Sequence, residues 1–304
     1  MVADLLLSNW GILDPMTAVD SLLMSSPLTQ PDRRAAALQR PFLKWAGGKF
    51  KIIDRILLAL PPGGRLLEPF VGSGAVFLNA SFDGFVLADN NPDLINLFLQ
   101  VQRHGADFVA QAQQLFTPEN NTEAAFYAFR DEFNHCTDTS RKSALFIYLN
   151  RHCFNGLYRT NSKGHFNVPF GRYKSPGFPL QELLVFHEKS QKACFLHQNF
   201  LRTMDEAQLG DVVYCDPPYA PLTGTSNFSA YTAEGFDQQA QEALATKAQE
   251  LRLRGIPVII SNHDTPFTRE IYQPAHITAF GVQRFIASKA AQRVKAAELL
   301  ACFA

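Results

Sequence analysis

The residues best suited to chemistry in this 304-residue chain are Asp216, Pro217, Pro218 and Tyr219, which directly follow an apolar run at 211–215. The run is typical of a short buried strand, and the two prolines end it because neither has a backbone N–H to continue a sheet. The carboxylate of Asp216 and the carbonyl of Pro217 provide two acceptors for one exocyclic amino group. The ring of Tyr219 provides a flat face on which a planar base can stack. This segment therefore indicates chemistry at the amino group of a nucleobase.

A second candidate site is the glycine-containing turn at 70–74, which follows a predicted strand at 65–68. Gly72 and Gly74 can adopt positive φ and let a ligand approach the backbone closely. Asp89 ends the next predicted strand, where an acidic side chain can accept hydrogen bonds from ribose hydroxyls. A glycine pair after a strand also suits dinucleotides, so NAD is the competing ligand. Hydride transfer would make no use of the acidic proline segment, which counts against NAD.

Strand and helix patterns alternate around both candidate sites. Apolar runs predict strands at 65–68, 84–89, 212–215 and 256–260. Two helices are predicted between these strands: one begins near Gly74, and the other covers 237–254. This alternation predicts an α/β fold with a doubly wound, mostly parallel sheet whose ligands bind at the carboxyl ends of the strands. The C-terminal stretch 283–303 is compatible with an antiparallel hairpin at the sheet edge.

The middle of the chain departs from this alternation. Helical periodicity occurs in four stretches, 93–103, 106–115, 124–134 and 141–150. A loop region rich in Gly, Asn, Tyr and Arg follows them. We therefore expect a catalytic domain at 40–91 and 180–304, with an inserted helical target-recognition domain at 92–179. Residues 1–39 are expected to be a poorly ordered extension with a brief helix at 18–24.

The formal net charge is zero, but the basic residues are unevenly distributed. No Asp or Glu occurs between Thr139 and Gln181 or between Ile271 and Ala297, whereas Lys and Arg occur in both stretches. A local basic surface on a neutral protein suits a binder that moves along a nucleic acid. The five cysteines lack Cys-x-x-Cys spacing, which argues against a metal site. Because no apolar run could span a membrane and no signal peptide is evident, we expect a cytoplasmic, monomeric protein.

The motifs occur in the order found in one known family. The sequence resembles the Dam family of DNA adenine-N6 methyltransferases from about residue 40 to about residue 303. Besides the Asp-Pro-Pro-Tyr segment, the matching stretches are 42–49, 67–74, 87–89, 149–151, 155–157, 166–173 and 260–264. The resemblance implies the class I S-adenosyl-L-methionine-dependent methyltransferase fold, with no metal. It also implies methyl transfer to N6 of an adenine flipped out of double-stranded DNA, within GATC.

The resemblance also assigns a set of cofactor contacts. S-adenosyl-L-methionine would contact Trp45, Lys49, Phe70, Gly72, Gly74, Asp89 and Asp216. Lys49 and Trp45 suit its methionine end, as a cation for the carboxylate and a ring beside the sulfonium or amine. A phosphate loop ending at Lys49 is excluded, because that motif needs a glycine where Leu43 stands and Ser or Thr where Phe50 stands.

For DNA recognition, the resemblance implies base contacts and phosphate contacts. The base contacts would be Lys44 at the outer guanine, Phe154 as an intercalating ring, Asn155 at the orphaned partner base, Leu157 and Pro169 at thymine, and Arg159 at a guanine. An arginine that forms paired hydrogen bonds to guanine is the commonest specific contact. Phosphate contacts, which position a protein without reading sequence, would come from Arg151, Lys163, Arg172 and Lys174.

The expected chemistry is direct methyl transfer. Adenine N6 is a weak nucleophile because its lone pair is delocalised into the ring. Hydrogen bonds from its two N–H groups to Asp216 and the Pro217 carbonyl would favour a pyramidal nitrogen whose lone pair faces the methyl group. Tyr219 would stack on the base. Cytosine-N4 enzymes more often carry Ser in place of the aspartate, so adenine is favoured.

Two alternatives remain open. One is an adenine-N6 methyltransferase of a restriction-modification system with a different target sequence. The other is a DNA-binding module without catalysis, against which the intact acidic and glycine motifs argue. One departure from the family is Ser288-Lys289-Ala290-Ala291, where relatives carry Ser-Asn-Gly-Gly, and it places rate and processivity in question more than reaction type.

Overall fold

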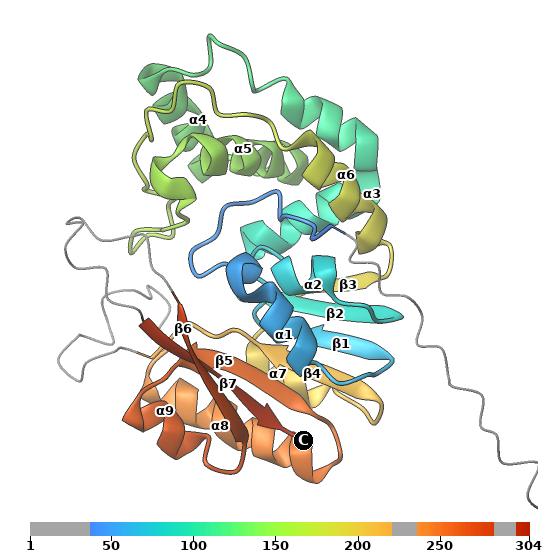
Figure 1. Cartoon of the computed structure of the whole chain (residues 1–304). Coiled ribbons are helices and arrows are strands. Elements are labelled where there is room, and N and C mark those ends of the chain that lie inside the picture. The colour runs from blue at the N-terminus through green and yellow to red at the C-terminus, as the bar shows by residue number, and fades with distance from the viewer. Residues whose placement is uncertain (1–36, 221–235, 283–295) are drawn as a thin grey trace, which may run out of the picture. The chain divides into compact units, whose positions relative to one another are not determined.

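The central element is a mostly parallel β-sheet with helices on both faces (Figure 1). The computed structural model describes residues 37–220, 236–282 and 296–304, and 39–304 form one compact unit. Within the described residues, the sheet has seven strands in the order β3-β2-β1-β4-β5-β7-β6. They are β1 Arg65–Glu68, β2 Gly84–Asp89, β3 Ala193–His197, β4 Asp211–Cys215, β5 Val258–His263, β6 His276–Val282 and β7 Ala296–Phe303. Strands β1 to β5 are parallel and β7 is antiparallel to both neighbours, which confirms the predicted fold class.

The strand order reverses at β1, because β2 pairs with one side of β1 and β4 with the other. Doubly wound sheets bind their ligands outside the carboxyl ends of the strands at such a reversal. Glu68 ends β1, and Asp216 directly follows β4. The topology therefore brings these two carboxyl groups to the same edge of the sheet.

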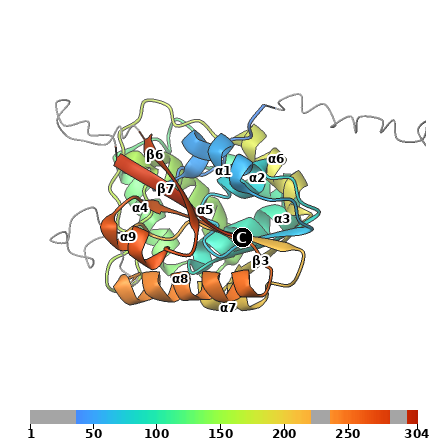
Figure 2. The same ribbon diagram turned by 60° about the horizontal axis from the view of Figure 1, so that its bottom comes forward.

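Alternate side chains of the central strands enter two different cores, as the period of a strand requires. The helices that cover the faces are α1 Ile53–Ala59, α2 Ala75–Asn79, α6 Leu180–Ser190, α7 Phe200–Asp205 and α8 Gln238–Leu253. Leu66 and Val212 pack with α1, α2 and α6, whereas their neighbours Leu67 and Val213 pack with α7 and α8. Figure 2 shows α7 and α8 together on one side of the sheet. Burial on both faces explains why these strands read as continuous apolar runs.

Three longer helices follow β2, namely α3 Pro92–Gln113, α4 Glu123–His135 and α5 Thr139–His152. Each begins at a polar side chain that accepts from the first-turn backbone: Asn91, Thr122 and Asp138. α3 contains a break at Gly105, where φ is 42° and an added Cβ would lie 2.7 Å from the ring of His187. The two helices expected at 93–103 and 106–115 are therefore two parts of α3. The placement of a domain boundary at 92–179 stays a prediction.

Three details of the sequence prediction were wrong. The edge strand β3 was not predicted, because only Phe195 among its residues is buried and the apolar pattern is weak. The hairpin exists, but its first strand is β6, which precedes the expected start at residue 283 and is defined by pairing with β7. Strand β5 continues to His263, beyond the expected end at Ile260, because polar residues extend it. The expected helix at 18–24 and the departure at 288–291 lie outside the described residues.

The remaining helical elements are short: α9 Pro266–Ile271 and two 3₁₀ turns at Lys49–Ile52 and Phe154–Gly156. Across the described ranges, none of the helices combines the length and apolar character needed to cross a membrane.

Candidate active site

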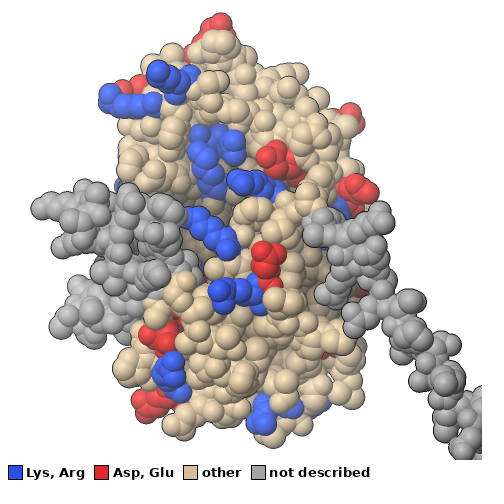
Figure 3. All heavy atoms as spheres, viewed as in Figure 1, with Lys and Arg blue, Asp and Glu red and all other residues tan. Residues whose placement is uncertain are grey.

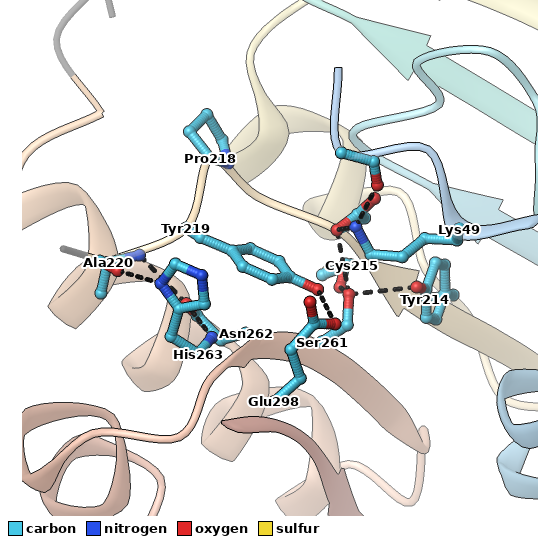
Figure 4. Close-up of polar contacts among 12 residues, drawn as sticks. Lys49, Tyr214, Cys215, Pro218, Tyr219, Ala220, Ser261, Asn262, His263 and Glu298 are labelled. Atoms are coloured by element: carbon cyan, nitrogen blue, oxygen red, sulfur yellow. Dashed lines mark hydrogen bonds and ion pairs between the residues drawn. The ribbon is translucent and has the colours of Figure 1, made fainter. Parts of the chain in front are cut away.

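Asp216 directly follows β4 and belongs to a polar cluster with Lys49 and with Ser261 of β5, which Figure 4 shows beside Tyr219 and Glu298. Its Oδ1 lies 2.7 Å from the Nζ of Lys49 and accepts a hydrogen bond from the Ser261 hydroxyl at 3.0 Å. Among the described residues, Oδ2 has no hydrogen-bonding partner. Burial raises the pKa of Asp216, and the charge and hydrogen bond of Lys49 oppose that rise. The ion pair therefore helps to keep a buried carboxylate available as an acceptor.

Lys49 holds this arrangement together from the N-terminal segment. Its Nζ also donates to the carbonyl of Gly47 at 2.6 Å and lies 4.5 Å from the centre of the Tyr219 ring. The Tyr219 hydroxyl donates to Glu298 at 3.3 Å. The ring of Tyr219 is thus fixed between a cation and a carboxylate on β7.

The backbone of the proline segment is held unequally. The Pro218 carbonyl accepts from Nε2 of Gln241 at 2.7 Å. The Pro217 carbonyl makes no hydrogen bond with any described residue. Sequence reasoning assigned the Pro217 carbonyl to substrate, and its lack of a protein partner is compatible with that role.

A pocket opens beside Asp216. It is lined by Trp45, Ala46, Gly48, Lys49, Glu68, Phe70, Val71, Gly72, Ser73, Ala75, Val76 and Asp216. The φ angles of Gly72 and Gly74 are 48° and 74°, as the sequence predicted for this turn. A Cβ at Gly72 would lie 3.0 Å from the Trp45 ring, so glycine is what allows the turn and the ring to approach. Of the seven predicted cofactor residues, five line this pocket.

Gly74 and Asp89 are the two that do not. Asp89 is half-buried at the end of β2, where its Oδ2 accepts from the backbone N–H of Gly72 at 3.1 Å and its Oδ1 from that of Asn91 at 3.0 Å. Asp89 therefore supports the glycine turn directly. Its proposed contact with ribose stays a prediction.

Glu68 is a buried carboxyl group of the pocket that sequence reasoning did not assign. It is 2% exposed, lines the pocket, and its Oε1 has no hydrogen-bond partner among the residues that the structure describes. Burial, and secondarily the negative charge of Asp216, raise its pKa well above the usual range. A buried acceptor without a hydrogen bond destabilises the folded state unless a ligand donates to it. The signal in the sequence was its place in the motif at 67–74, directly before the glycine turn.

The predicted DNA contacts Phe154 and Asn155 lie in the loop that follows α5. Phe154 is 51% exposed, and Asn155 has a φ of 54° and donates its backbone N–H to the Tyr173 hydroxyl at 3.0 Å. Lys44 lies 4.5 Å from the centre of the Tyr173 ring. Partial burial, and then the charge of Arg151, lower the pKa of Lys44. The structure thus brings Lys44, which is distant in sequence, to the same surface as this loop.

The other predicted base contacts differ in their exposure. Arg159 is exposed, and its Nε donates to Asn167 Oδ1 at 2.6 Å, which orients the guanidinium group. Pro169 is exposed, and its carbonyl accepts from the Phe154 N–H at 2.9 Å. Leu157 is half-buried against the core. All three residues come from the loops after α5.

The predicted phosphate contacts differ in the bonds that they make within the protein. Arg172 forms an ion pair with Glu123 at 3.3 Å, and Arg151 donates to the Gly177 carbonyl at 3.1 Å. Lys163 and Lys174 are exposed. Basic side chains gather along the middle of the face seen in Figure 3, between the α4–α5 region and the sheet.

A second set of polar residues that sequence reasoning missed comes from β5 and α8. Ser261, Asn262 and His263 end β5 and are buried, and Gln241 of α8 is buried beside them. The signal was available, because a Ser-Asn-His run continues a strand whose preceding residues are all apolar. Polar side chains at the carboxyl end of a buried strand need partners, and here these partners include Asp216 and the proline segment.

The fold, the acidic proline segment and the adjoining glycine-lined pocket define a nucleic-acid base methyltransferase. Residues 45–286 match the family described as D12 class N6 adenine-specific DNA methyltransferase, and the chain belongs to this family. The sequence-based assignment to the Dam family is confirmed, and the protein is a DNA adenine methyltransferase.

Close relatives span almost the same length. The chain is 50% identical over 265 residues to the DNA adenine methylase of Serratia marcescens, which covers 87% of this chain and 98% of that protein. It is 50% identical over 264 residues to that of Escherichia coli (strain K12), covering 87% and 95%. Identity to that of Vibrio cholerae (El Tor Inaba N16961) is 47% over 266 residues, covering 87% and 96%. A solved structure of a conserved hypothetical protein from Streptococcus pyogenes has a TM-score of 0.34 at 13% identity, covering 84% of this chain and 94% of that chain, and we draw nothing from it.

Proposed function

We propose that this enzyme transfers the methyl group of S-adenosyl-L-methionine to N6 of an adenine flipped out of double-stranded DNA, within GATC. One observation carries the proposal. Within the described residues, the Oδ2 of Asp216 and the carbonyl of the adjacent Pro217 have no hydrogen-bonding partner, and Asp216 lines the same pocket as Glu68, whose Oε1 is also without one. The acceptors of Asp216 and Pro217 suit an amino group, whereas Oε1 of Glu68 suits a cationic ligand.

The residues around the pocket fit S-adenosyl-L-methionine. When bound, this cofactor supplies a methyl group activated by a sulfonium centre. Glu68 would accept from its ammonium group, because Oε1 has no partner in the described part of the chain and a cation would favour the ionised carboxyl. Lys49 would contact its carboxylate, since only two of the three ammonium N–H groups are needed for Gly47 and Asp216. Trp45, next to the glycine turn, would pack against the methionine portion.

Asp216 and Pro217 would orient the amino group that accepts the methyl. Adenine N6 lies inside a duplex, so the base must be extruded before these acceptors can reach it. Both N6–H groups would then donate, one to Asp216 and one to the Pro217 carbonyl, while Tyr219 stacks on the ring. The negative charge of Asp216 would stabilise the positive charge that develops on N6, and its fixed position lowers the entropic cost of orientation.

The surface formed by the loops after α5 would read the DNA sequence. Nε and Nη2 of Arg159 both donate to Asn167, which orients the guanidinium group, and the N–H groups not used in these bonds would donate to a guanine edge. The exposed ring of Phe154 would insert at the base step opened by flipping. Lys163 and Lys174 would contact phosphates without reading bases.

Methylation of defined duplexes tests the proposal. Purified enzyme would be incubated with S-adenosyl-L-methionine that carries a labelled methyl group, and with a duplex that contains one GATC. Matched duplexes would carry N6-methyladenine at the target or one substituted base pair. Label on the GATC duplex alone is the expected result. Equal labelling of a duplex with another sequence would refute GATC recognition and favour the restriction-modification alternative, whereas label that persists when both target adenines are N6-methylated would refute the N6 site.

A further inference from the structure

We propose that Gln241 and Asn262 are positioning residues that hold the loop 216–220 in its reactive geometry. The inference rests on the proposed role of Asp216 and Pro217 in methyl transfer. Neither residue touches the cofactor pocket or the proposed DNA surface. Both act on the loop through its backbone.

Two of the five residues of the loop, Pro217 and Pro218, have no backbone N–H that could hold the loop in place. Three backbone atoms beyond Pro217 are anchored instead. Nε2 of Gln241 donates to the Pro218 carbonyl at 2.7 Å, and the Ala220 N–H donates to Oδ1 of Asn262 at 3.0 Å. Nδ1 of His263 donates to the Ala220 carbonyl at 2.6 Å. All three anchors come from β5 and α8, and Figure 4 shows Asn262 and His263 beneath the loop.

The orientation of both amides follows from these contacts. The Ala220 N–H can only donate, so the side-chain oxygen of Asn262 must face it. Nδ2 of Asn262 then faces Oε1 of Gln241 at 3.0 Å, which leaves Nε2 of Gln241 directed at the Pro218 carbonyl. The hydroxyl of Tyr272 accepts from Nδ2 of Asn262 at 3.1 Å. Gln241, Asn262 and His263 each bond a backbone atom of the loop, so a different loop position would break more than one bond.

Burial makes the arrangement stiff. The side chains of Gln241, Asn262 and Tyr272 are all 0% exposed, so water cannot replace a bond lost among these three. The anchored Pro218 carbonyl is adjacent in the chain to the Pro217 carbonyl, which makes no hydrogen bond among the described residues. Fixing one carbonyl therefore fixes the direction of the next. A displacement of about 1 Å in a reacting group can lower the rate by about 100-fold.

A pair of matched glutamines separates positioning from general stability. Gln241→Met removes the donor to the Pro218 carbonyl. Gln102→Met is the control, because Nε2 of Gln102 donates in the same way to the Ser190 and Ala193 carbonyls, away from the site. For both variants we would measure melting temperature, single-turnover methylation, and the Kd of S-adenosyl-L-methionine and of duplex. Both should lose stability, but only Gln241→Met should lose rate, by about 10- to 100-fold, with each Kd changed less than about two-fold.

The following outcomes would overturn the inference or the proposed function on which it rests. Equal single-turnover rates for Gln241→Met and Gln102→Met would overturn the inference, as would a rate loss that is matched by loss of ligand binding. If Gln241→Met does not fold, Gln241→Glu replaces it, because it keeps the size and the acceptor towards Asn262. That variant should lose rate as pH rises and its carboxyl ionises, and a pH profile parallel to the wild type would overturn the inference. Asp216→Ala is assayed alongside, because activity retained by this variant would refute the proposed function itself. If Asp216→Ala is inactive and Gln241→Met is fully active, only the positioning role is refuted.

Discussion

Replacing Glu68 with glutamine should stabilise the free enzyme above neutral pH and weaken cofactor binding. Both effects come from the buried carboxyl of Glu68, whose Oε1 has no hydrogen-bond partner within the described ranges. The pKa of Glu68 is raised in the folded state. The stability that this carboxyl contributes is therefore fully present below its unfolded pKa of about 4.3 and is lost as pH rises through the folded pKa. Glutamine has the same size and does not ionise. Each unit by which the pKa is raised corresponds to about 1.4 kcal/mol of stability lost by the wild type at high pH.

Cofactor binding should change in the opposite direction. A hydrogen bond between a carboxylate and an ammonium group contributes about 1.5–3 kcal/mol. Its loss in Glu68→Gln should raise the Kd of S-adenosyl-L-methionine by about 10- to 100-fold. Methylthioadenosine lacks the amino-acid portion and is the matched ligand, so its Kd should be the same for both proteins. The variant then separates the carboxyl's interaction with the ammonium group from any general damage to the pocket.

The measurements are denaturant unfolding at pH 5, 7 and 8.5 without cofactor, and calorimetric titration with both ligands. The stability difference in favour of the glutamine variant should be small at pH 5 and grow with pH. A variant that is less stable than the wild type at pH 8.5 would contradict the burial argument. Unchanged affinity for S-adenosyl-L-methionine would remove Glu68 from the cofactor site.

Three further predictions concern the reaction and the DNA. Asp216→Ala should abolish methyl transfer while duplex binding, measured by fluorescence anisotropy, stays within about three-fold, because the proposed DNA surface is separate; turnover above a few per cent of the wild type would contradict the assigned role. Lys49→Met should move the acidic limb of the pH–rate profile to higher pH, because Lys49 opposes the burial that raises the pKa of Asp216, and an unmoved limb would show that this pair does not control the rate. Arg159→Ala should relax discrimination between GATC and singly substituted duplexes by about 1–3 kcal/mol, whereas Lys174→Ala should weaken all duplexes alike and reduce the salt slope by about one unit. Methylation rates at several salt concentrations compare the two, and an equal slowing on every duplex by Arg159→Ala would show that Arg159 reads no base.

The sequence by itself determined the fold class, the acidic proline segment and the glycine turn. These features are local, because strand periodicity, missing N–H groups and positive φ depend on neighbouring residues. The long helices were predicted from their periodicity, although α3 was expected as two helices. The edge strands β3 and β6 were not, because pairing with neighbouring strands defines them more than apolar patterning does.

Only the tertiary structure decided which distant side chains meet. Sequence reasoning assigned Lys49 to the cofactor, but the fold also places it 2.7 Å from Asp216. The pairing of β1 with β4 brings Glu68 to the same pocket, and α8 supplies Gln241 to the proline segment. None of these contacts has a local signature, because each depends on strand order and on which buried polar groups remain to be satisfied. The chain thus encodes the reacting groups locally, whereas their charge state and orientation depend on long-range packing.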